Sequence, residues 1–336
     1  MWKTNCKQGA FAVETIKGLT NWRLTVRREA EAVTILRAVT CDREAALPDT
    51  LFGLPVTALA DHALAAGASP VEGEEIRVLG GAESEDWDNR SITALTLPRP
   101  LERFGDYAFM NLGRMETLRF SDRLRELGSA AFMNCRCFSR LELSREGLQQ
   151  GPALASIVRN LPHELDVTVY RPEGDTLRLI FPEYIESYTE NTPAHHFELK
   201  IIGGGYAYHG VFREKTLSVS NYDSLWRDYI AQEHDDLSAL RLAYYRLRYP
   251  AGLSDRAREQ YGAFLRQNLR DALFFALREK DSQGLALLLA LGGAGDGALD
   301  AALEEARRLR LTEATALLLE KRRERPAAGR MRKFEL

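Results

Sequence analysis

One stretch of the chain nearly repeats itself at a fixed step of 23 residues. Residues 104–111 (FGDYAFMN) return as residues 127–134 (LGSAAFMN). The similarity also covers the preceding segments, because residues 92–97 (ITALTL) correspond to residues 115–120 (METLRF), and a third copy begins at residues 138–143 (FSRLEL). In each of these segments apolar and polar residues alternate, which is the pattern of a half-buried strand. The spacing therefore predicts a stack of equivalent units with one strand in each.

A single unit of this size cannot bury its apolar side, so neighbouring units must stack around a continuous core. A period in the range of about 20–29 residues is typical of leucine-rich repeats. The step of 23 residues aligns three columns of apolar side chains: Leu95, Leu118 and Leu141; Leu97, Phe120 and Leu143; and Phe109 and Phe132. Polar residues lie between the first two columns, and we expect them to form a solvent-facing row of Thr96, Arg119 and Glu142.

The repeat resembles the BspA-like leucine-rich repeats, whose units read as a strand, a proline, an apolar residue and then apolar-Gly-x-x-Ala-Phe-x-x-Cys. Residues 104–109 and 127–135 fit this pattern closely. Residues 47–64 are similar to a first unit that has Ala60 and Leu64 in place of the usual glycine and phenylalanine. The resemblance covers about residues 20–145 and implies a β-solenoid. Many members of the family are surface proteins.

An acidic segment interrupts the repeats at residues 72–88, where seven positions carry Asp or Glu. Residues 76–79 (IRVL) can supply one strand within it. We interpret the rest as a solvated loop, with a binding site for a basic partner as the alternative.

Beyond the repeats, residues 165–170 (LDVTVY) alternate and are predicted to form the last rung of the stack. Strand-like runs follow at residues 176–181, 197–202 and 206–212, separated by turn signals. Residues 203–205 are three glycines, but the Lys-Ser/Thr pair that opens the helix of a phosphate loop is missing. We therefore predict a hairpin turn there, within a small β segment.

The period becomes helical from Asp223, with a predicted helix that stops at Pro250 and a second one capped by Ser254. Residues 271–289 then return as residues 301–319 at a step of 30. Each copy is predicted to be a helix, a short turn and a second helix. The pair resembles ankyrin-type helices without their Thr-Pro-Leu-His signature, and generic helical hairpins are the alternative.

The predicted fold class is α+β and multi-domain, with an N-terminal leucine-rich-repeat β-solenoid, a small β segment and a C-terminal all-α helical-hairpin module. The expected divisions are a repeat domain at 1–170, a β-rich connecting subdomain at 171–221, an ankyrin-like helical domain at 222–325 and a basic tail at 326–336.

No motif identifies a catalytic, cofactor or metal site. Cys135-x-Cys137 lacks the second pair of ligands that a closed zinc site needs, and the repeat pattern expects a buried cysteine at position 135. His195, His196 and His209 could meet only across a hairpin, and their spacing does not place two ligands on one helix face. We expect surface and core roles for these residues, with a cryptic hydrolase or metalloprotein as the remote alternative.

We therefore expect a non-enzymatic interaction or scaffold protein that binds a protein partner through its repeat surfaces, at the row of Thr96, Arg119 and Glu142. The formal net charge of −3 provides no global attraction for nucleic acid, and nucleic-acid binding through the basic stretch 321–333 is the less favoured alternative. We expect no cofactor, no membrane contact and no small-molecule substrate. Four sparse cysteines and a start without a secretory apolar run indicate a reduced, cytoplasmic protein.

Overall fold

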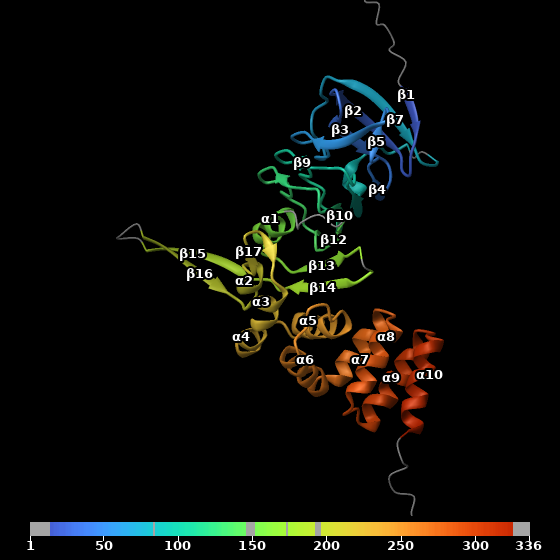
Figure 1. The fold of residues 1–336 in the computed structure, drawn as a ribbon, viewed down its shortest axis with the longest axis vertical. Helices are drawn as coiled ribbons and strands as arrows, with labels where there is room; N and C mark the ends of the chain where they lie inside the picture. The colour runs from blue at the N-terminus through green and yellow to red at the C-terminus, as the bar shows by residue number, and fades with distance from the viewer. Residues whose placement is uncertain (1–13, 83–84, 146–151, 173, 192–195, 325–336) are drawn as a thin grey trace, which may run out of the picture. The chain divides into compact units, whose positions relative to one another are not determined.

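The chain folds into two compact units, and Figure 1 labels most of their helices and strands. The first contains the residues up to Asp175 together with Phe212–Leu217, and the second contains Thr176–Val211 together with the chain from Ser218 on. Strands come first and helices follow, so the predicted mixed class with this order is confirmed. The finer division into four domains stays a prediction. The computed structural model describes residues 14–82, 85–145, 152–172, 174–191 and 196–324.

One sheet of the first unit begins with four strands outside the regular repeats: β1 (Glu14–Lys17), β2 (Trp22–Arg28), β3 (Val33–Thr40) and β7 (Glu74–Leu79). Strand β2 pairs antiparallel with both β3 and β7, and β1 pairs parallel with β7. Because β7 comes from the acidic segment, the prediction that residues 76–79 supply a strand is confirmed. The segment therefore returns the chain to its N-terminal strands before the second repeat begins.

The repeats contribute strands to two parallel ladders. The first ladder contains, in spatial order, β4 (Glu44–Ala46), β8 (Ala94–Thr96), β10 (Thr117–Ser121), β12 (Arg140–Ser144) and β13 (Leu165–Tyr170). The second contains β6 (Leu54–Leu59), β9 (Arg103–Phe104) and β11 (Glu126–Leu127), and it continues the N-terminal sheet because β6 pairs with β3. Short elements complete the unit: β5 (Thr50–Leu51), the 3-10 turn η1 (Asn89–Ser91), α1 (Ala153–Asn160), β17 (Phe212–Arg213) and β18 (Thr216–Leu217).

The register of the first ladder confirms the alignment expected from the repeat. Leu118 stands opposite Leu95 on one side and Leu141 on the other, and all three side chains are fully buried. Val167 in β13 stands opposite Leu141, so residues 165–170 form the last rung as predicted. Each rung covers the apolar side of its neighbour, which is how a stack of short strands obtains a core.

The turns between the ladders repeat their backbone conformation as well as their sequence. Tyr107 and Ala130 have positive φ angles of 54° and 51°, and Asn111 and Asn134 have 65° and 61°. Asparagine tolerates this left-handed region better than most residues. The Asn134 side-chain amide also donates to Asn111 Oδ1 at 2.8 Å, so the asparagines stabilise both the turn and the contact between rungs.

Three strands lie in the second unit: β14 (Thr176–Phe181), β15 (Ile185–Asn191) and β16 (His196–Ile202). The strands expected at 176–181 and 197–202 are thus confirmed. The expected strand at 206–212 is wrong, because Gly205–His209 forms a short helix, α2. Tyr208 and His209 are both buried, which successive residues of a half-buried strand cannot achieve because they point to opposite faces.

The predicted hairpin turn at residues 203–205 is also wrong, because Gly205 already belongs to α2. These glycines allow a close approach of backbone rather than a reversal of the chain. A Cβ atom at Gly205 would lie 2.1 Å from the carbonyl oxygen of Pro182, and one at Gly204 would lie 2.6 Å from the ring of Tyr229.

The rest of the second unit is helical: α3 (Val219–Ser224), α4 (Trp226–Ala231), α5 (Asp236–Arg248), α6 (Asp255–Gln267), α7 (Leu269–Arg278), α8 (Ser282–Leu291), α9 (Asp296–Arg308) and α10 (Thr312–Arg323). Helix α5 ends before Pro250, and Ser254 caps α6 by accepting from the backbone N–H of Ala257, as predicted. The step of 30 corresponds to the pairs α7–α8 and α9–α10. Their ankyrin-like character stays a prediction. Within the described residues no helix has the length and apolarity needed to cross a membrane.

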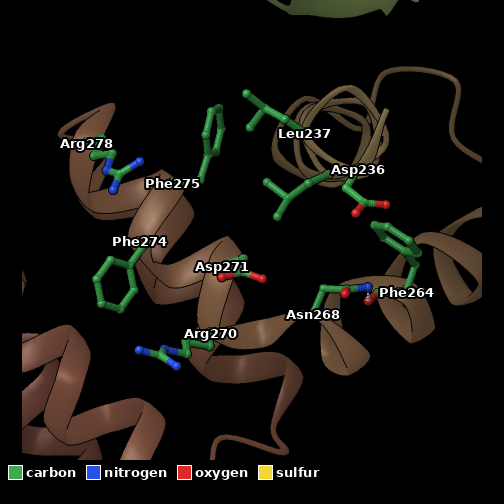
Figure 2. A pocket seen from close by; sticks show the side chains of 10 residues that line it. Asp236, Leu237, Phe264, Asn268, Arg270, Asp271, Phe274, Phe275 and Arg278 are labelled. Carbon is green, nitrogen blue, oxygen red and sulfur yellow. Dashed lines mark hydrogen bonds between the residues drawn. The ribbon is translucent and has the colours of Figure 1, made fainter. Parts of the chain in front are cut away.

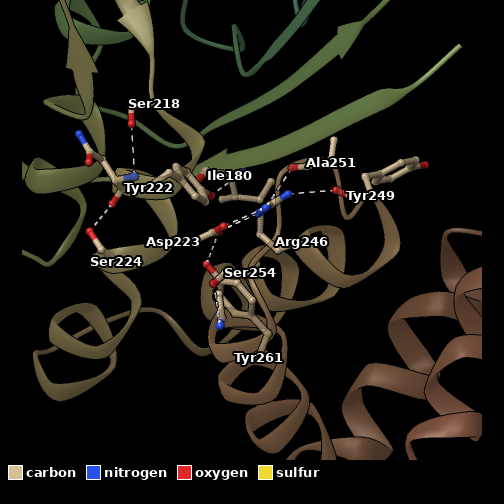
Figure 3. A network of polar contacts seen from close by, with 12 residues as sticks. Ile180, Ser218, Tyr222, Asp223, Ser224, Arg246, Tyr249, Ala251, Ser254 and Tyr261 are labelled. Atoms are coloured by element: carbon tan, nitrogen blue, oxygen red, sulfur yellow. Dashed lines mark hydrogen bonds and ion pairs between the residues drawn. The ribbon is translucent and has the colours of Figure 1, made fainter. Parts of the chain in front are cut away.

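A buried ion pair joins α3 to α5 in the core of the second unit (Figure 3). The guanidinium of Arg246 is fully buried and donates to both carboxylate oxygens of Asp223, at 2.8 and 2.9 Å. The Tyr261 hydroxyl of α6 donates to Asp223 Oδ1 at 2.9 Å. Burial opposes the charge of Arg246, but the pairing with Asp223 outweighs it and raises the pKa of the guanidinium. The carboxylate of Asp223 therefore connects α3, α5 and α6 through hydrogen bonds.

Asp281 makes a second, half-buried connection at the start of α8. Its carboxylate accepts from the backbone N–H of Gly284 at 2.9 Å, the Tyr244 hydroxyl at 2.8 Å and Arg248 Nε at 3.0 Å. Burial alone would raise the pKa of this carboxyl group, but the hydrogen bonds outweigh burial and lower the pKa below its usual value. A carboxylate of lowered pKa stabilises the folded state above its unfolded pKa of about 3.9, and this contribution is lost as the pH falls through the folded-state pKa.

Asp281→Ala is therefore expected to destabilise the second unit by about 1–2 kcal/mol at neutral pH, because a cap and a buried acceptor are lost. The difference from the wild type should shrink as the pH falls below about 4. Thermal unfolding followed by circular dichroism across this pH range measures both effects. A difference that stays constant down to low pH would contradict the assigned role of the carboxylate.

Candidate functional site

The candidate row of the first ladder is formed as predicted. Arg119 stands opposite Thr96 in β8 and opposite Glu142 in β12. Arg119 Nε donates to Glu142 Oε2 at 3.0 Å, and the two side chains keep 40% and 21% of their surface exposed. Because inward-facing leucines alternate with these residues, the row lies on the outer face of the ladder.

The structure extends this row at both ends. Ala46 in β4 stands opposite Thr96, and Thr168 in β13 stands opposite Glu142, although Thr168 is itself buried. Sequence reasoning missed both. The alignment of Val167 with Leu141 could have identified Thr168, but the acidic segment separates Ala46 from Thr96 by 50 residues, which is no multiple of 23.

A neighbouring row on the same face ends in an aromatic residue. Ser121, Ser144 and Tyr170 occupy equivalent register positions; Ser121 is buried, whereas the Tyr170 side chain is 44% exposed. Tyrosine is enriched at protein interfaces because it offers a large apolar ring with a polar tip. The face therefore combines small side chains towards β4, an internally neutralised ion pair in the middle and an exposed aromatic residue at the β13 end.

The cysteine motif has a structural role. Cys135 is buried, and its thiol donates to the carbonyl oxygen of Phe109 at 3.1 Å. Burial raises the pKa of this thiol to about 12, so it stays protonated at neutral pH and is a poor nucleophile or metal ligand. Cys137, two residues on, is exposed. The expectation that Cys135 packs in the core is confirmed.

The three candidate histidines do not form a common site. The ring of His209 is buried and within 2.9 Å of the carbonyl oxygen of Pro182, at the base of the β15–β16 hairpin. His196 pairs with Asn191 at the other end of that hairpin, about 20 Å away at the usual rise of a strand. His195 lies outside the described residues. Among the residues that the structure describes, no group of three or more His, Cys, Asp or Glu side chains is arranged to hold a metal ion.

Only the start of the basic stretch belongs to the described chain. Lys321 pairs with Glu324 at 2.9 Å, and Arg322 pairs with Asp300 at 3.1 Å. These two cations neutralise neighbouring acids at the end of α10. Residues 325–336 lie outside the described residues, so nucleic-acid binding by the tail stays a prediction.

A cleft of about 480 Å³ opens in the second unit between α5, α6 and α7 (Figure 2). Its apolar lining includes Phe264, Phe274 and Phe275, and Leu237 is 56% exposed at its rim. Arg270 and Arg278 lie four residues, or about one helical turn, before and after Phe274 in α7. The volume is within the range of about 300–1,000 Å³ found for ligand sites. Sequence reasoning missed this cleft because its walls come from three helices.

Comparison with known proteins identifies the type of repeat. Residues 83–151 match the family model described as the BspA type leucine rich repeat region, six copies. The chain carries a BspA-type leucine-rich repeat region. No curated protein sequence matches the chain. A crystal structure of the T. pallidum leucine-rich repeat protein TpLRR is similar over 38% of this chain and 75% of its own, at 12% identity and a TM-score of 0.20.

The BspA-type region contains the whole predicted row. Thr96, Arg119 and Glu142 lie on three successive rungs within residues 83–151. Thr168 and Tyr170 lie beyond it, on the last rung, β13. The face is therefore a property of the matched repeats, extended by β13.

Proposed function

We propose that this chain is a non-enzymatic interaction protein that binds a protein partner through the outer face of the BspA-type region. The observation that supports this most directly is the register that places Thr96, Arg119 and Glu142 side by side on one half-exposed row. Leucine-rich repeats generally mediate protein–protein interaction, because a stack of short strands presents a long, regular surface. In this proposal the two ladders form a solenoid whose surface is the binding site.

The charges of the face favour a protein over a polyanion. Arg119 is already paired with Glu142, so the row carries no surplus positive charge for phosphate groups. A protein surface with its own alternating charges can instead pair with both side chains. The thiols of Cys41, Cys135 and Cys137 are free, which supports the cytoplasmic location as part of the same proposal.

A double charge swap, Arg119→Glu with Glu142→Arg, tests the face without breaking its ion pair. The swap should keep the fold but present reversed charges to the partner, and it should weaken partner binding at least about tenfold. The partner is first identified by affinity capture and mass spectrometry with wild-type protein, and its dissociation constant is then measured by calorimetry for each variant.

The other ladder offers a matched control. Arg103 in β9 and Glu126 in β11 are exposed and stand directly opposite each other on two successive rungs. The swap Arg103→Glu with Glu126→Arg changes the same residue types on a different face, so it should leave partner binding unchanged. Equal binding by all three proteins would refute the proposed face, and capture of no macromolecule together with turnover of a small molecule would refute the proposed class.

A further inference from the structure

Exposed apolar residues are concentrated on the β15–β16 hairpin of the second unit. Ile185, Tyr188, Leu199 and Ile202 keep between 39% and 66% of their surface exposed. Tyr188 stands opposite Leu199, so two of these side chains form a cross-strand pair on one face of the hairpin. Exposed apolar residues in one contiguous segment are typical of an interaction site.

The hairpin also offers unpaired strand edges. Strands β15 and β16 form a two-stranded sheet by themselves, and neither outer edge pairs with another strand in the part of the chain that the structure describes. A two-stranded hairpin is marginally stable alone, and an open edge is a template for pairing with another chain.

The outer edge of β16 is complementary to itself. When two copies of β16 are placed antiparallel with Leu199 opposite Leu199, Glu198 of each copy stands opposite Lys200 of the other. Glu198 and Lys200 are both exposed. In an antiparallel pair, directly opposite residues lie on the same side of the sheet, where opposite charges attract. One register therefore forms two ion pairs and one central leucine pair at once.

We propose that the chain forms a symmetric dimer in which β16 of one copy pairs antiparallel with β16 of a second copy. The result is a continuous four-stranded sheet in the order β15, β16, β16 and β15, with a two-fold axis at Leu199. A two-fold interface requires a self-complementary surface, which the charges of β16 provide. This dimer is independent of the partner-binding face of the BspA-type region.

The other edge of the hairpin is a poorer choice for the same contact. Antiparallel self-pairing of β15 about Tyr188 would place the glutamate positions 186 and 190 of the two copies opposite each other. Like charges directly opposite destabilise a strand pair. The charge pattern thus distinguishes the two edges and selects β16.

Charge reversal at a single position is the test. Lys200→Glu puts Glu198 opposite a glutamate, and Glu198→Lys puts Lys200 opposite a lysine, so each variant should raise the dimer dissociation constant at least about tenfold. The double variant with both changes exchanges the two charges and should dimerise as the wild type does. Sedimentation velocity of the full chain over a concentration series measures each dissociation constant.

Mixing the two single variants provides a second readout. A Lys200→Glu copy and a Glu198→Lys copy are complementary, so the mixture should form a heterodimer although each variant alone is monomeric. This recovery also shows that both variants are folded. Glu186→Lys, a charge reversal on β15 of the same hairpin, is the matched control and should leave the dissociation constant within about threefold of the wild type.

Several results would overturn the proposal. They are a monomeric wild-type chain at every concentration, a Lys200→Glu variant that dimerises unchanged, a mixture without heterodimer, or a dimer that is lost in Glu186→Lys. A dimer that is instead strengthened in Glu186→Lys would assign the contact to the β15 edge, because residue 186 would then stand as a lysine opposite Glu190 of the other copy.

Discussion

Asp223→Ala is expected to destabilise the second unit by about 3–5 kcal/mol, because it leaves the guanidinium of Arg246 buried without a counter-ion. Arg246 would keep only the carbonyl oxygens of Tyr249 and Ala251, at 3.0 and 3.4 Å. The Tyr261 hydroxyl would lose its acceptor as well. Removing one partner of a buried ion pair lowers the free energy of unfolding by far more than the intact pair contributes to it, since the remaining charge cannot reach water.

Two comparisons isolate the buried charge as the cause. Glu259→Gln removes the partner of Arg266, an exposed ion pair of 2.7 Å, and should cost less than about 1 kcal/mol. The double variant Asp223→Leu with Arg246→Met removes both charges and should be more stable than Asp223→Ala. Urea unfolding followed by circular dichroism gives the three free energies. A double variant that is less stable than Asp223→Ala would contradict this account.

Gly128→Ala is expected to destabilise the first unit by about 2–4 kcal/mol, because no space exists for a side chain between the rungs. A Cβ atom at this position would lie 2.1 Å from the carbonyl carbon of Gly105 and 2.3 Å from the backbone nitrogen of Asp106. These atoms belong to the backbone of the preceding rung, so no side-chain rotation can relieve the contact. The strands β9 and β11, which end directly before these two glycines, would have to separate or tilt.

Gly113→Ala is the matched control within the same repeats. A Cβ atom there would have its nearest neighbour, the carbonyl oxygen of Asn134, at 3.8 Å, which is an ordinary van der Waals distance. Its effect should stay within about 0.5 kcal/mol. Urea unfolding together with hydrogen exchange of the amides in and next to β9 and β11 measures the effect in the repeats. Equal stability of the two variants would show that the rungs can move apart freely.

The first repeat has Ala60 where the later repeats have glycine, and its position in the structure explains why. Ala60 occupies the position of Gly105 in the first unit, and its backbone N–H donates to the carbonyl oxygen of Ile35 in β3 rather than to an earlier repeat. The crowding that excludes a Cβ atom at Gly105 and Gly128 comes from the turn of the preceding repeat. The first repeat has none before it, so alanine is accepted.

The candidate row could be predicted because it depends on the repeat alone. Once Leu95, Leu118 and Leu141 are aligned, the residue after each leucine must lie on the opposite face of the ladder. The cleft lined by Phe264 and Phe274 could not be predicted in this way, since its walls come from helices whose packing the local pattern does not specify. The helix α2 was missed because it is short. Its five residues are too few for a helical period to be distinguished from alternation.

The amino-acid sequence by itself determined the rungs, their order and the row of Thr96, Arg119 and Glu142, because a repeated unit has equivalent neighbours and one spacing sets every contact. It also determined the helical pairs α7–α8 and α9–α10, through their step of 30, and the start of α6, through the cap at Ser254. Only the tertiary structure decided which side chains meet across elements that share no period. The Asp223–Arg246 pair, the return of β7 to the N-terminal strands and the open edge of β16 belong to this class, because each depends on contacts between segments whose separation in the chain follows no local rule.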